Sequence, residues 1–515
     1  MTDGAPRVAG HVPVVIVGAG PTGVAAATLL AQHGVECLVL DRWPGVYPQP
    51  RAVHLDDEIY RVIARLGIAD EFAAISRPTL GLRLLDNRFT VLAEFTRDPT
   101  RSVHGYPQAN MFDQPELESL LRANLKRYPG AQVRGDAEVT AVTDHEGRVR
   151  VTFTDRSTGL AHLVDADYLL GCDGANSLVR AQMGSAMRDL NFEQRWLVVD
   201  VATDTNLQQW EGVHQVCDPV RAGTYMRIGR SRYRWEFQLL AGESADEFGT
   251  VSALRPLITP WIADIPDSEL TVLRVTEYTF RAQIADRWRR GNIFILGDAA
   301  HLTPPFIGQG MGAGLRDAMN LSWKIAGVLN GTFSGTLVTD VLDSYEQERK
   351  PHARSMIRLA LNVGLSMTGG GQFGNLARRL VLPRLRWVPG LRDKVVDSTT
   401  PALHPSALVS RSRRGRRLAG TLCPNPLLPG GQRLDDVLGP RFALITTEPL
   451  DVADEALLRG RGVEVLVAER GSELGRWLRR GRAMAAIVRP DRTVMRAGRD
   501  TAALCAWTAT IIQSG

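Results

Sequence analysis

Glycine and aspartate residues near the start of the chain have the types and spacing that bind an anionic cofactor. Gly18-x-Gly20-x-x-Gly23 directly follows the apolar run at residues 14–17. Gly18 permits a tight turn, Gly20 lets a pyrophosphate approach the backbone, and Gly23 lets a helix pack closely on a strand. Asp41 ends the next apolar run, at the position that hydrogen-bonds an unphosphorylated ribose. This spacing predicts a dinucleotide site for FAD or NAD rather than NADP.

A second glycine-rich stretch, "GDAAHLTPPFIGQGMGAGLRDAMNLSWK" (Gly297 to Lys324), follows the apolar run "NIFIL". It crosses two prolines and several glycines before it becomes a periodic helix. Glycines at a helix entrance allow close approach to the backbone. Free N–H groups there, together with the helix dipole, favour negative charge. The stretch therefore predicts a flat, large or anionic ligand lying on this turn.

A third segment, "CDGANSLVR" (Cys172 to Arg180), follows the strand-like run "YLLG". Taken alone, it indicates only an Asp-Gly turn. Its place between the other two motifs makes a chance arrangement of all three much less plausible.

These motifs need strands and helices that hold them. The strand at 14–17, the helix "VAAATLLAQHG" ended by Gly34 and the strand "VECLVLDR" form a β-α-β unit of a dinucleotide fold. Further helices are predicted from Asp56 to about Leu66 and from Asp113 to Tyr128, with Asp113 placed as an N-cap.

The remaining segments predict two further layers. Residues 78–105 and 132–170 alternate like strands, and 190–285 predicts an antiparallel sheet that forms a separate substrate layer. Helices are expected from 312 to about 365, followed by a Gly-, Pro- and Arg-rich linker. From about Thr421, the strands "RFALIT", "VEVLVAE" and "MAAIVRP" predict a small α/β domain.

Length and composition exclude several classes of protein. A chain of 515 residues with 44% hydrophobic and 23% charged residues is expected to fold into two or three globular domains. The net charge of +5, with no basic run interleaved with aromatics, gives no sign of nucleic-acid binding. Five scattered cysteines indicate neither a disulfide framework nor a metal site. Without a signal pattern or a long apolar run, we expect a cytoplasmic protein that binds no membrane.

Together the three motifs resemble those of the single-component, class A flavoprotein aromatic hydroxylases. Within that family the chain is most similar to the 3-(3-hydroxyphenyl)propionate hydroxylase-like branch, which includes phenol hydroxylases and polyketide-tailoring hydroxylases. The segment from "YTFRAQ" to "KIAGVL" is similar almost throughout, and "PRAVHLDDE" and "RYRWEFQLLAGE" add to the resemblance. It is strong over about residues 12–350. The last hundred residues resemble the branch's thioredoxin-like domain; without a CxxC motif, we interpret them as structural.

The fold class implied by this resemblance is α/β. It consists of a Rossmann-like FAD-binding domain of the GR2 type, an antiparallel β-sheet substrate domain and a C-terminal thioredoxin-like α/β domain. The boundaries that we predict are 1–77 (FAD-binding), 78–111 (substrate-domain strands), 112–188 (FAD-binding), 189–285 (substrate-binding sheet), 286–365 (FAD-binding and helices), 366–420 (linker or helical segment) and 421–515 (thioredoxin-like).

FAD contacts are implied for residues of all three motifs. Backbone N–H groups near Met311 and Gly312 would face the N1–C2=O edge of the flavin, which is negative when reduced. Asp298 and Gln114 would bond the ribityl chain, and Arg51 would reach a phosphate near the nicotinamide approach. The full set is Gly18, Gly20, Gly23, Asp41, Arg42, Arg51, Gln114, Asp173, Gly297, Asp298, Pro305, Gly310, Met311 and Gly312.

The chemistry implied is hydroxylation of a phenolic or other small aromatic substrate. NADH or NADPH would reduce FAD, and O2 would add to the flavin as a C4a-hydroperoxide that transfers OH to the ring. With no second GxGxxG, NAD(P)H would bind transiently. Candidates for catalysis are His54, which could equally be structural, and Pro305. Candidates for substrate contact are His54, Pro304 and three aromatic residues of the presumed substrate sheet that could instead be core: Tyr225, Trp235 and Phe237.

Several alternatives stay open. The same oxygenated flavin could perform Baeyer–Villiger, ring-opening or epoxidation chemistry on a polyketide-like substrate. A non-catalytic FAD-binding protein would be expected to have lost a motif, and all are intact. A flavin dehydrogenase of another family would share only the GxGxxG. Arg227 or Arg274 could meet a substrate carboxylate. The protein is expected to be a monomer or homodimer.

Overall fold

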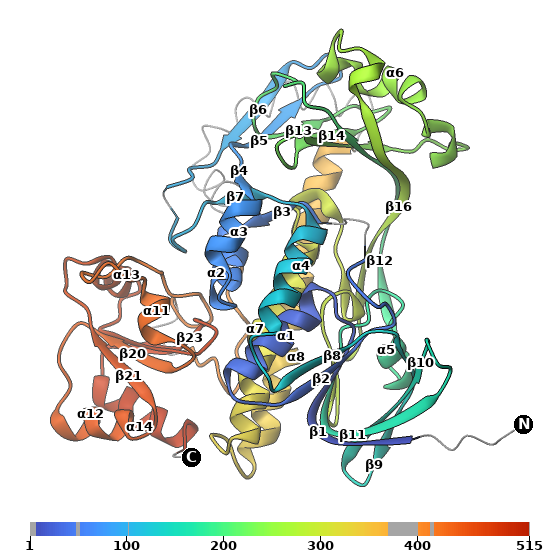
Figure 1. Cartoon of the computed structure of the whole chain (residues 1–515). Coiled ribbons are helices and arrows are strands. Elements are labelled where there is room, and N and C mark those ends of the chain that lie inside the picture. The colour runs from blue at the N-terminus through green and yellow to red at the C-terminus, as the bar shows by residue number, and fades with distance from the viewer. Residues whose placement is uncertain (1–6, 48–51, 101, 369–399, 412–416, 514–515) are drawn as a thin grey trace, which may run out of the picture.

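The computed structural model describes residues 7–47, 52–100, 102–368, 400–411 and 417–513. Figure 1 shows a first sheet at the N-terminal end, a second sheet at the opposite end, and long helices running between them, with the C-terminal region beside those helices. The largest buried apolar cluster belongs to the first sheet and its helices. Within the described ranges, no helix combines the length and apolarity needed to cross a membrane.

The first sheet is built around β1, which lies between β11 and β2 and runs parallel to both. The side chains of Val14 to Val17 are at most 6% exposed, as expected for a parallel strand that is covered on both faces. β9 and β10 continue the sheet as an antiparallel hairpin next to β11. The strands are β1 (Arg7–Val17), β2 (Cys37–Leu40), β8 (Ala131–Arg134), β9 (Ala137–His145), β10 (Arg148–Asp155), β11 (Ala161–Gly171), β17 (Arg289–Arg290) and β18 (Ile293–Ile295).

The helices of the first sheet approach one another through glycine. A Cβ atom on Gly314 of α7 would lie 2.2 Å from the Oγ1 atom of Thr22 in α1 and 3.1 Å from the Cα atom of Gly297. Only glycine therefore allows α1 and α7 to pack at this separation. The helices here are α1 (Pro21–Gln32), α4 (Gln114–Leu125), α5 (Leu178–Gln182), α7 (Gly310–Leu329) and α8 (Leu337–Thr368), with the short 3-10 turns η3 (Gly297–Ala299) and η4 (Pro305–Ile307).

The second sheet has the strand order β19-β16-β12-β15-β14-β13-β5-β6. Its outer face is covered by α6 (Val251–Ile262), whose Leu254, Ile258 and Trp261 join the buried cluster of that face. The 3-10 turns η1 (Ala245–Phe248) and η2 (Asp267–Glu269) flank this helix. The strands are β5 (Gly81–Leu85), β6 (Val91–Thr96), β12 (Met187–Ala202), β13 (Val213–Val216), β14 (Gly223–Arg227), β15 (Arg232–Gln238), β16 (Thr271–Ala285) and β19 (His301–Leu302).

A small antiparallel sheet, in the order β3-β7-β4, lies between the two large ones (Figure 1). Asp56 ends its first strand and caps α2, because its Oδ1 atom accepts a hydrogen bond from the Ile59 N–H at 2.8 Å. The elements are β3 (His54–Asp56), β4 (Arg77–Pro78), β7 (Ala109–Met111), α2 (Asp57–Arg65) and α3 (Ala69–Ile75).

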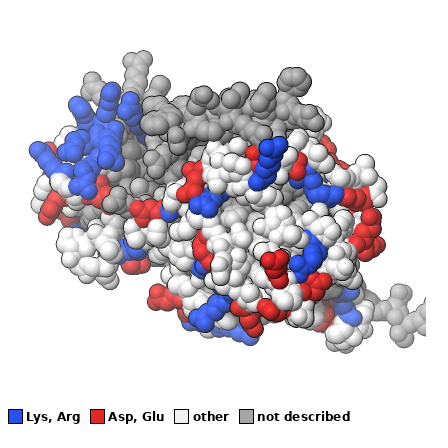
Figure 2. Space-filling model, turned by 90° about the horizontal axis from the view of Figure 1, so that it is seen from above, with Lys and Arg blue, Asp and Glu red and all other residues white. Residues whose placement is uncertain are grey.

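The C-terminal region is a four-stranded sheet in the order β21-β20-β22-β23, with β20 parallel to β21 and antiparallel to β22. One of its buried clusters includes Trp323 of α7. On its surface, α13 and the adjoining turns expose several arginines, and Figure 2 shows basic side chains gathered on that side of the molecule. The elements are α11 (Leu434–Leu438), β20 (Phe442–Thr446), α12 (Val452–Arg459), β21 (Val463–Val467), α13 (Glu473–Arg480), β22 (Ala485–Val488), β23 (Val494–Gly498) and α14 (Thr501–Ile511).

Buried ion pairs join this region to the long helices. Arg489 donates to Glu348 of α8 at 2.8 Å and to Asp491 at 2.9 Å. The Nζ atom of Lys324 in α7 donates to the same Glu348 at 2.9 Å. The side chains of Arg489, Glu348 and Lys324 are fully buried. The C-terminal region is therefore an integral layer of the molecule, not a loosely attached module.

Two predictions from the pattern need correction. Asp113 precedes α4 but makes no capping hydrogen bond, because its carboxylate is paired with Arg232 of the second sheet. Within the alternating segment 78–105, the strands end at Thr96, and residues 97–100 and 102–105 are irregular. Much of the predicted linker, at 369–399 and 412–416, lies outside the described residues.

We expect Gly314→Ala to lower the free energy of unfolding by about 1–3 kcal/mol, because the added methyl group must displace Thr22 or the backbone of Gly297. Chemical denaturation of the purified protein measures this change. In the matched control Gly249→Ala, the new Cβ atom meets only one atom, at 3.8 Å, and the change should stay within about 0.5 kcal/mol. An equal effect of both substitutions would contradict the glycine contact.

Candidate functional site

The first glycine turn combines two tightly packed glycines with one that faces open space. Gly18 has a φ of +103°, and a Cβ atom there would lie 2.3 Å from the carbonyl oxygen of Cys172. A Cβ atom on Gly23 would lie 2.0 Å from the carbonyl oxygen of Gly18. By contrast, nothing described lies within 4 Å of a Cβ atom added to Gly20, the N-cap residue of α1. The turn thus leaves room for a ligand at the positive end of this helix.

Asp41, at the end of β2, shapes the same turn. Its Oδ2 atom accepts from the Ala19 N–H at 2.6 Å and its Oδ1 atom from the Trp43 N–H at 2.8 Å. Arg122 of α4 donates to the Ala19 carbonyl at 3.0 Å. Arg42 is exposed, with its guanidinium 5.4 Å from the centre of the Trp43 ring. Arg122, which the sequence did not indicate, therefore adds a positive charge beside the predicted ribose site.

The "DG" segment braces the other two motifs. Asp173 accepts from the Ser177 hydroxyl at 2.5 Å and from the Val179 N–H at 3.0 Å. Burial raises the pKa of Asp173, although both of these donors lower it. Arg180 donates to the carbonyl of Ala299 at 3.0 Å and so ties this segment to the "GDA" turn.

A buried carboxylate, that of Asp317 in α7, fixes the "GDAAH" turn. Its Oδ2 atom accepts from the Gly297 N–H at 3.0 Å and pairs with the Nε2 atom of His301 at 2.7 Å, while its Oδ1 atom accepts from Arg349 of α8 at 2.8 Å. Burial alone would raise the pKa of Asp317, but His301 and Arg349 lower it. Gly297 turns the chain with a φ of +60°, and Asp298 follows, half-buried, in η3. The geometry of the turn is thus set by a charge on the following helix.

A second buried network fixes the entrance of α7. Gln309, its N-cap residue, donates to Asp56 at 2.7 Å and accepts from Arg316 at 2.7 Å. The same Arg316 donates to Glu58 at 2.6 Å. Nothing described lies within 4 Å of a Cβ atom added to the next residue, Gly310. The N-terminus of α7 therefore has open backbone, and the charge pairs of Arg316 with Asp56 and Glu58 fix its position.

Met311 and Gly312 follow in the first turn of α7. Met311 is half-buried and packs on the main core. A Cβ atom on Gly312 would lie 2.9 Å from the Cγ1 atom of Ile59 and 3.1 Å from the Nη1 atom of Arg316. Glycine at 312 is therefore explained by close packing on α2.

His54, Pro304 and Pro305 come together near the entrance of α7. Gly308, which follows η4, has a φ of +62°, and a Cβ atom there would lie 2.8 Å from the Nδ1 atom of His54. Burial, with help from Arg97, lowers the pKa of His54 to about 4. His54 is therefore neutral near pH 7, and it faces the loop that starts with the two prolines.

Gln114, at the start of α4, holds the backbone near the predicted phosphate ligand. It accepts from the Ala52 N–H at 2.5 Å and donates to Glu118 at 2.7 Å. Arg51 itself lies outside the described residues. The structure thus shows the contact of Gln114 with Ala52, and the role predicted for Arg51 stays a prediction.

Three predicted substrate contacts lie in the core. Tyr225, Trp235 and Phe237 are at most 4% exposed and pack with α6 on the outer face of the second sheet. Their neighbour Met226 points to the other face, where it packs with Val53, next to His54. Because side chains alternate along a strand, the inner face toward the cofactor motifs is formed by the even-numbered residues of β14 and β15.

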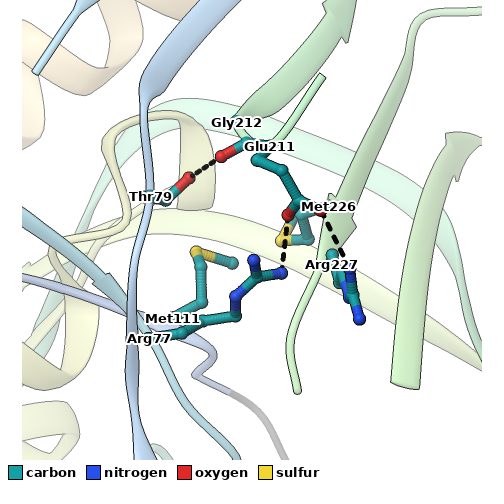
Figure 3. A pocket seen from close by; sticks show the side chains of 7 residues that line it. All are labelled: Arg77, Thr79, Met111, Glu211, Gly212, Met226 and Arg227. Atoms are coloured by element: carbon teal, nitrogen blue, oxygen red, sulfur yellow. Dashed lines mark hydrogen bonds and ion pairs between the residues drawn. The ribbon is translucent and has the colours of Figure 1, made fainter. Parts of the chain in front are cut away.

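A crevice at the join of the small sheet and the second sheet is closed by ion pairs. Figure 3 shows Glu211 between Arg77 and Arg227, at 2.6 Å and 2.8 Å respectively. Thr79 donates to the carbonyl of Glu211 at 2.9 Å, and Met111 and Met226 form the apolar wall. Arg227, one candidate for a substrate carboxylate, is thus engaged by a protein carboxylate.

The arrangement as a whole suits a large anionic cofactor. The two helix N-termini at Gly20 and Gly310 offer free backbone donors and space. Sequence reasoning missed the buried charges behind them. Arg316 and Asp317 were nevertheless visible as a charged pair within a helix of small and apolar residues, where charges are rarely buried unless paired. The missed residues are Asp56, Glu58, Arg122, Arg316, Asp317 and Arg349.

Comparison with known protein families matches residues 11–360 to the family described as "FAD binding domain". The chain is 33% identical over 439 residues to a 3-(3-hydroxy-phenyl)propionate/3-hydroxycinnamic acid hydroxylase of Burkholderia vietnamiensis, covering 84% of this chain and 78% of that protein. It is 32% identical over 515 residues to a probable NADH-specific resorcinol 4-hydroxylase of Rhodococcus jostii, covering 96% and 93% respectively.

Solved structures show the same fold. The flavin-dependent monooxygenase PieE, in complex with FAD and substrate, matches with a TM-score of 0.79 at 24% identity, covering 98% of this chain and 99% of that one. Aklavinone-11 hydroxylase, in a ternary complex with FAD and aklavinone, matches with a TM-score of 0.79 at 24% identity, covering 97% and 99%.

We expect Gly20→Ala to weaken FAD binding at least ~10-fold, a loss of about 1.4 kcal/mol, while the unfolding free energy of the FAD-free protein changes by less than about 1 kcal/mol. The new methyl group would enter only the open space at the end of α1. Fluorescence titration with FAD and denaturation of the FAD-free protein measure the two effects. In the control Gly23→Ala, the larger effect should be a loss of unfolding free energy in the FAD-free protein, because the new methyl group would meet the Gly18 carbonyl. Unchanged FAD affinity in Gly20→Ala would contradict the site.

We expect Asp317→Asn to cost about 3–5 kcal/mol of stability, because it leaves the buried Arg349 without its counter-charge. FAD retention on a desalting column should fall with it, since the "GDAAH" turn loses its brace. The control Asp343→Asn removes a more exposed pair between Asp343 of α8 and Arg289 of β17 and should cost at most about 1 kcal/mol. Equal effects of the two substitutions would show that the buried carboxylate has no special role.

Proposed function

The chain belongs to the FAD-binding domain family of flavoproteins, and on that premise we propose that it is a monooxygenase that hydroxylates a phenolic or related aromatic ring. NADH or NADPH would be the reductant and O2 the oxygen donor. The observation that carries this proposal is the pair of open helix N-termini at Gly20 and Gly310, in a chain whose curated relatives have the names of aromatic hydroxylases.

The residues that would hold FAD lie at and between the N-termini of α1 and α7. The ADP half would lie at the first turn and the flavin ring at the entrance of α7, with the ribityl chain between them near Asp298, Asp173 and Gln114. Arg122 would add a charge near the ribose. The proposed FAD residues are Gly18, Gly20, Gly23, Asp41, Arg42, Arg51, Gln114, Asp173, Gly297, Asp298, Pro305, Gly310, Met311 and Gly312.

When bound and reduced, FAD activates O2 for transfer of one oxygen atom to an electron-rich ring. The protein would orient the reactants, stabilise negative charge and exclude water from the site. Free N–H groups at Gly310 and Met311 would stabilise negative charge on a flavin held at this helix end. Phe306, whose ring centroid lies 6.1 Å from that of Trp196, closes the loop against the second sheet and excludes water. Neutral His54 can orient a substrate hydroxyl as donor or acceptor, with Pro304 and Pro305 as a rigid wall.

The domain boundaries given from the sequence are retained as part of the proposal. A thioredoxin-like assignment of 421–515 is supported by its parallel pair β20–β21, followed by the antiparallel hairpin β22–β23 and a final helix. Cys423 and Cys505 of this region are both buried and lie far apart in sequence. We therefore propose that the region has a structural role.

The FAD-loaded protein should oxidise NADH or NADPH faster when a suitable phenol is present. Testing both nucleotides with a panel of phenols, phenylpropionates and polycyclic phenols, with mass spectrometry of the products, measures this. One added oxygen atom with an intact ring is the expected product.

The control is the same panel with protein freed of FAD, which should give no product. A product with a cleaved or expanded ring would replace hydroxylation with a ring-opening oxygenation. A rate that no aromatic compound stimulates would contradict the proposed function.

A further inference from the structure

The inner face of the second sheet forms a row of polar groups in the middle of the sheet. In the antiparallel register, Glu236 of β15 lies opposite Thr224 of β14 on one side and Val198 of β12 on the other. Paired residues of neighbouring strands point to the same face. Glu236 therefore points away from the α6 core, which holds its neighbours Trp235 and Phe237.

Contacts on both sides place this row opposite the cofactor motifs. On one side, Trp196, two residues from Val198 on the same face, packs against Phe306 of the "PPF" loop. On the other side, Met226 packs with Val53, the residue before His54. His54 in turn contacts Gly308 of the same loop. The carboxylate of Glu236 thus faces the region bounded by His54 and the "PPF" loop, where the proposed function puts the substrate ring.

The arginines of this face are already engaged. Arg234 binds Asp200 through two hydrogen bonds, of 2.7 and 2.9 Å, and both side chains are at most 1% exposed. Arg232 pairs with Asp113. Arg274 donates to the hydroxyl of Tyr278 and lies over its ring. Arg234 and Arg232 are thus each paired with a carboxylate, whereas Arg274 bonds a neutral hydroxyl.

Unlike the neighbouring polar groups of this face, the carboxylate of Glu236 has no hydrogen-bond partner among the described residues. Thr224 donates to Gln215 at 2.8 Å, and Gln215 donates to the carbonyl of Gly223 at 3.1 Å, so these neighbours satisfy one another. Within the described part of the chain, no hydrogen bond reaches the side chain of Glu236. Burial raises its pKa, with Arg234 and Arg274 acting in the opposite direction. A half-buried acceptor without a donor is costly unless a ligand or water supplies one.

We propose that Glu236 is a specificity-determining residue, which accepts a hydrogen bond from a hydroxyl or amide N–H of the substrate and rejects substrates that have a carboxylate at that end. This rests on the proposed function. The substrate class is then a neutral aromatic compound with a hydroxyl or amide N–H at the end that meets Glu236, in contrast to the phenylpropionates named for some of the relatives. Repulsion between two carboxylates in a partly buried site disfavours the acid.

Two matched probe pairs test the charge preference with the FAD-loaded enzyme. The first is 3-(3-hydroxyphenyl)propionate and its amide, and the second is 1,8-dihydroxyanthraquinone with and without a carboxylate. Dissociation constants come from the change in flavin absorbance at pH 8, where the probe acids are ionised. We expect the neutral member of the better-binding pair to bind at least ~10-fold tighter, a difference of about 1.4 kcal/mol.

Three variants separate charge from fold. Glu236→Gln should reduce the preference to less than about 3-fold by strengthening binding of the acid, a change of about 0.7 kcal/mol or more. Glu236→Asp keeps the charge and should retain the preference. Glu193→Gln removes one negative charge from an exposed pair with Arg281 on the same sheet and should behave like the wild type. Thermal unfolding of each variant checks that the fold is intact.

Several outcomes would overturn the proposal: equal or tighter binding of the acid by the wild type, an unchanged preference in Glu236→Gln, or no binding of any probe. A purely structural role for Glu236 would change the unfolding temperature without changing the preference. If the predicted preference is found but NADH or NADPH drives no hydroxylation of any bound probe, the proposed function fails while the selective role of Glu236 stands.

Discussion

The carboxylate of Asp317 is the point on which the rest of the site depends. It accepts from the N–H of Gly297, pairs with the side chain of His301 and accepts from Arg349 of α8. A buried carboxylate is tolerated only when donors and counter-charges surround it. These three groups must therefore all lie around Asp317 in the folded protein. The left-handed turn at Gly297 and the direction of α7 are consequences of that requirement.

A second set of buried charge pairs connects α7 to the small sheet and α2. Arg316, the residue before Asp317, points to the other side and joins Asp56, Glu58 and Gln309. Two neighbouring charges of one helix thus bind different partners, while its N-terminus has no side chain at Gly310. Gly310 has no side chain that could hold the helix end. The contacts that hold it come from the N-cap residue Gln309 and from Arg316, further along the helix.

Local features of the sequence predicted the parts of the site that are local in space. The β-α-β unit with Gly18, Gly20 and Gly23 was predictable because turn, strand and helix signals are all contained within about thirty residues. The buried pairs were not, since Asp56 and Arg316 are 260 residues apart. Alternation along β15 predicts two faces but does not indicate which face meets the cofactor, so the pattern alone cannot separate the core aromatic residues from Glu236. Asp113 failed as a cap because a distant arginine competes for its carboxylate.

The seam between the C-terminal region and α8 has a consequence for the order in which the protein is made. Glu348 and Lys324 lie within the family-matched part of the chain, but Arg489 is synthesised 141 residues after Glu348. Domains generally fold as they emerge during synthesis. On a ribosome, however, the buried Glu348 of α8, which also accepts from Lys324 of α7, lacks this partner until the segment that contains Arg489 has been translated. The packing of α7 and α8 is therefore completed by a part of the chain that is made later than the FAD-binding motifs.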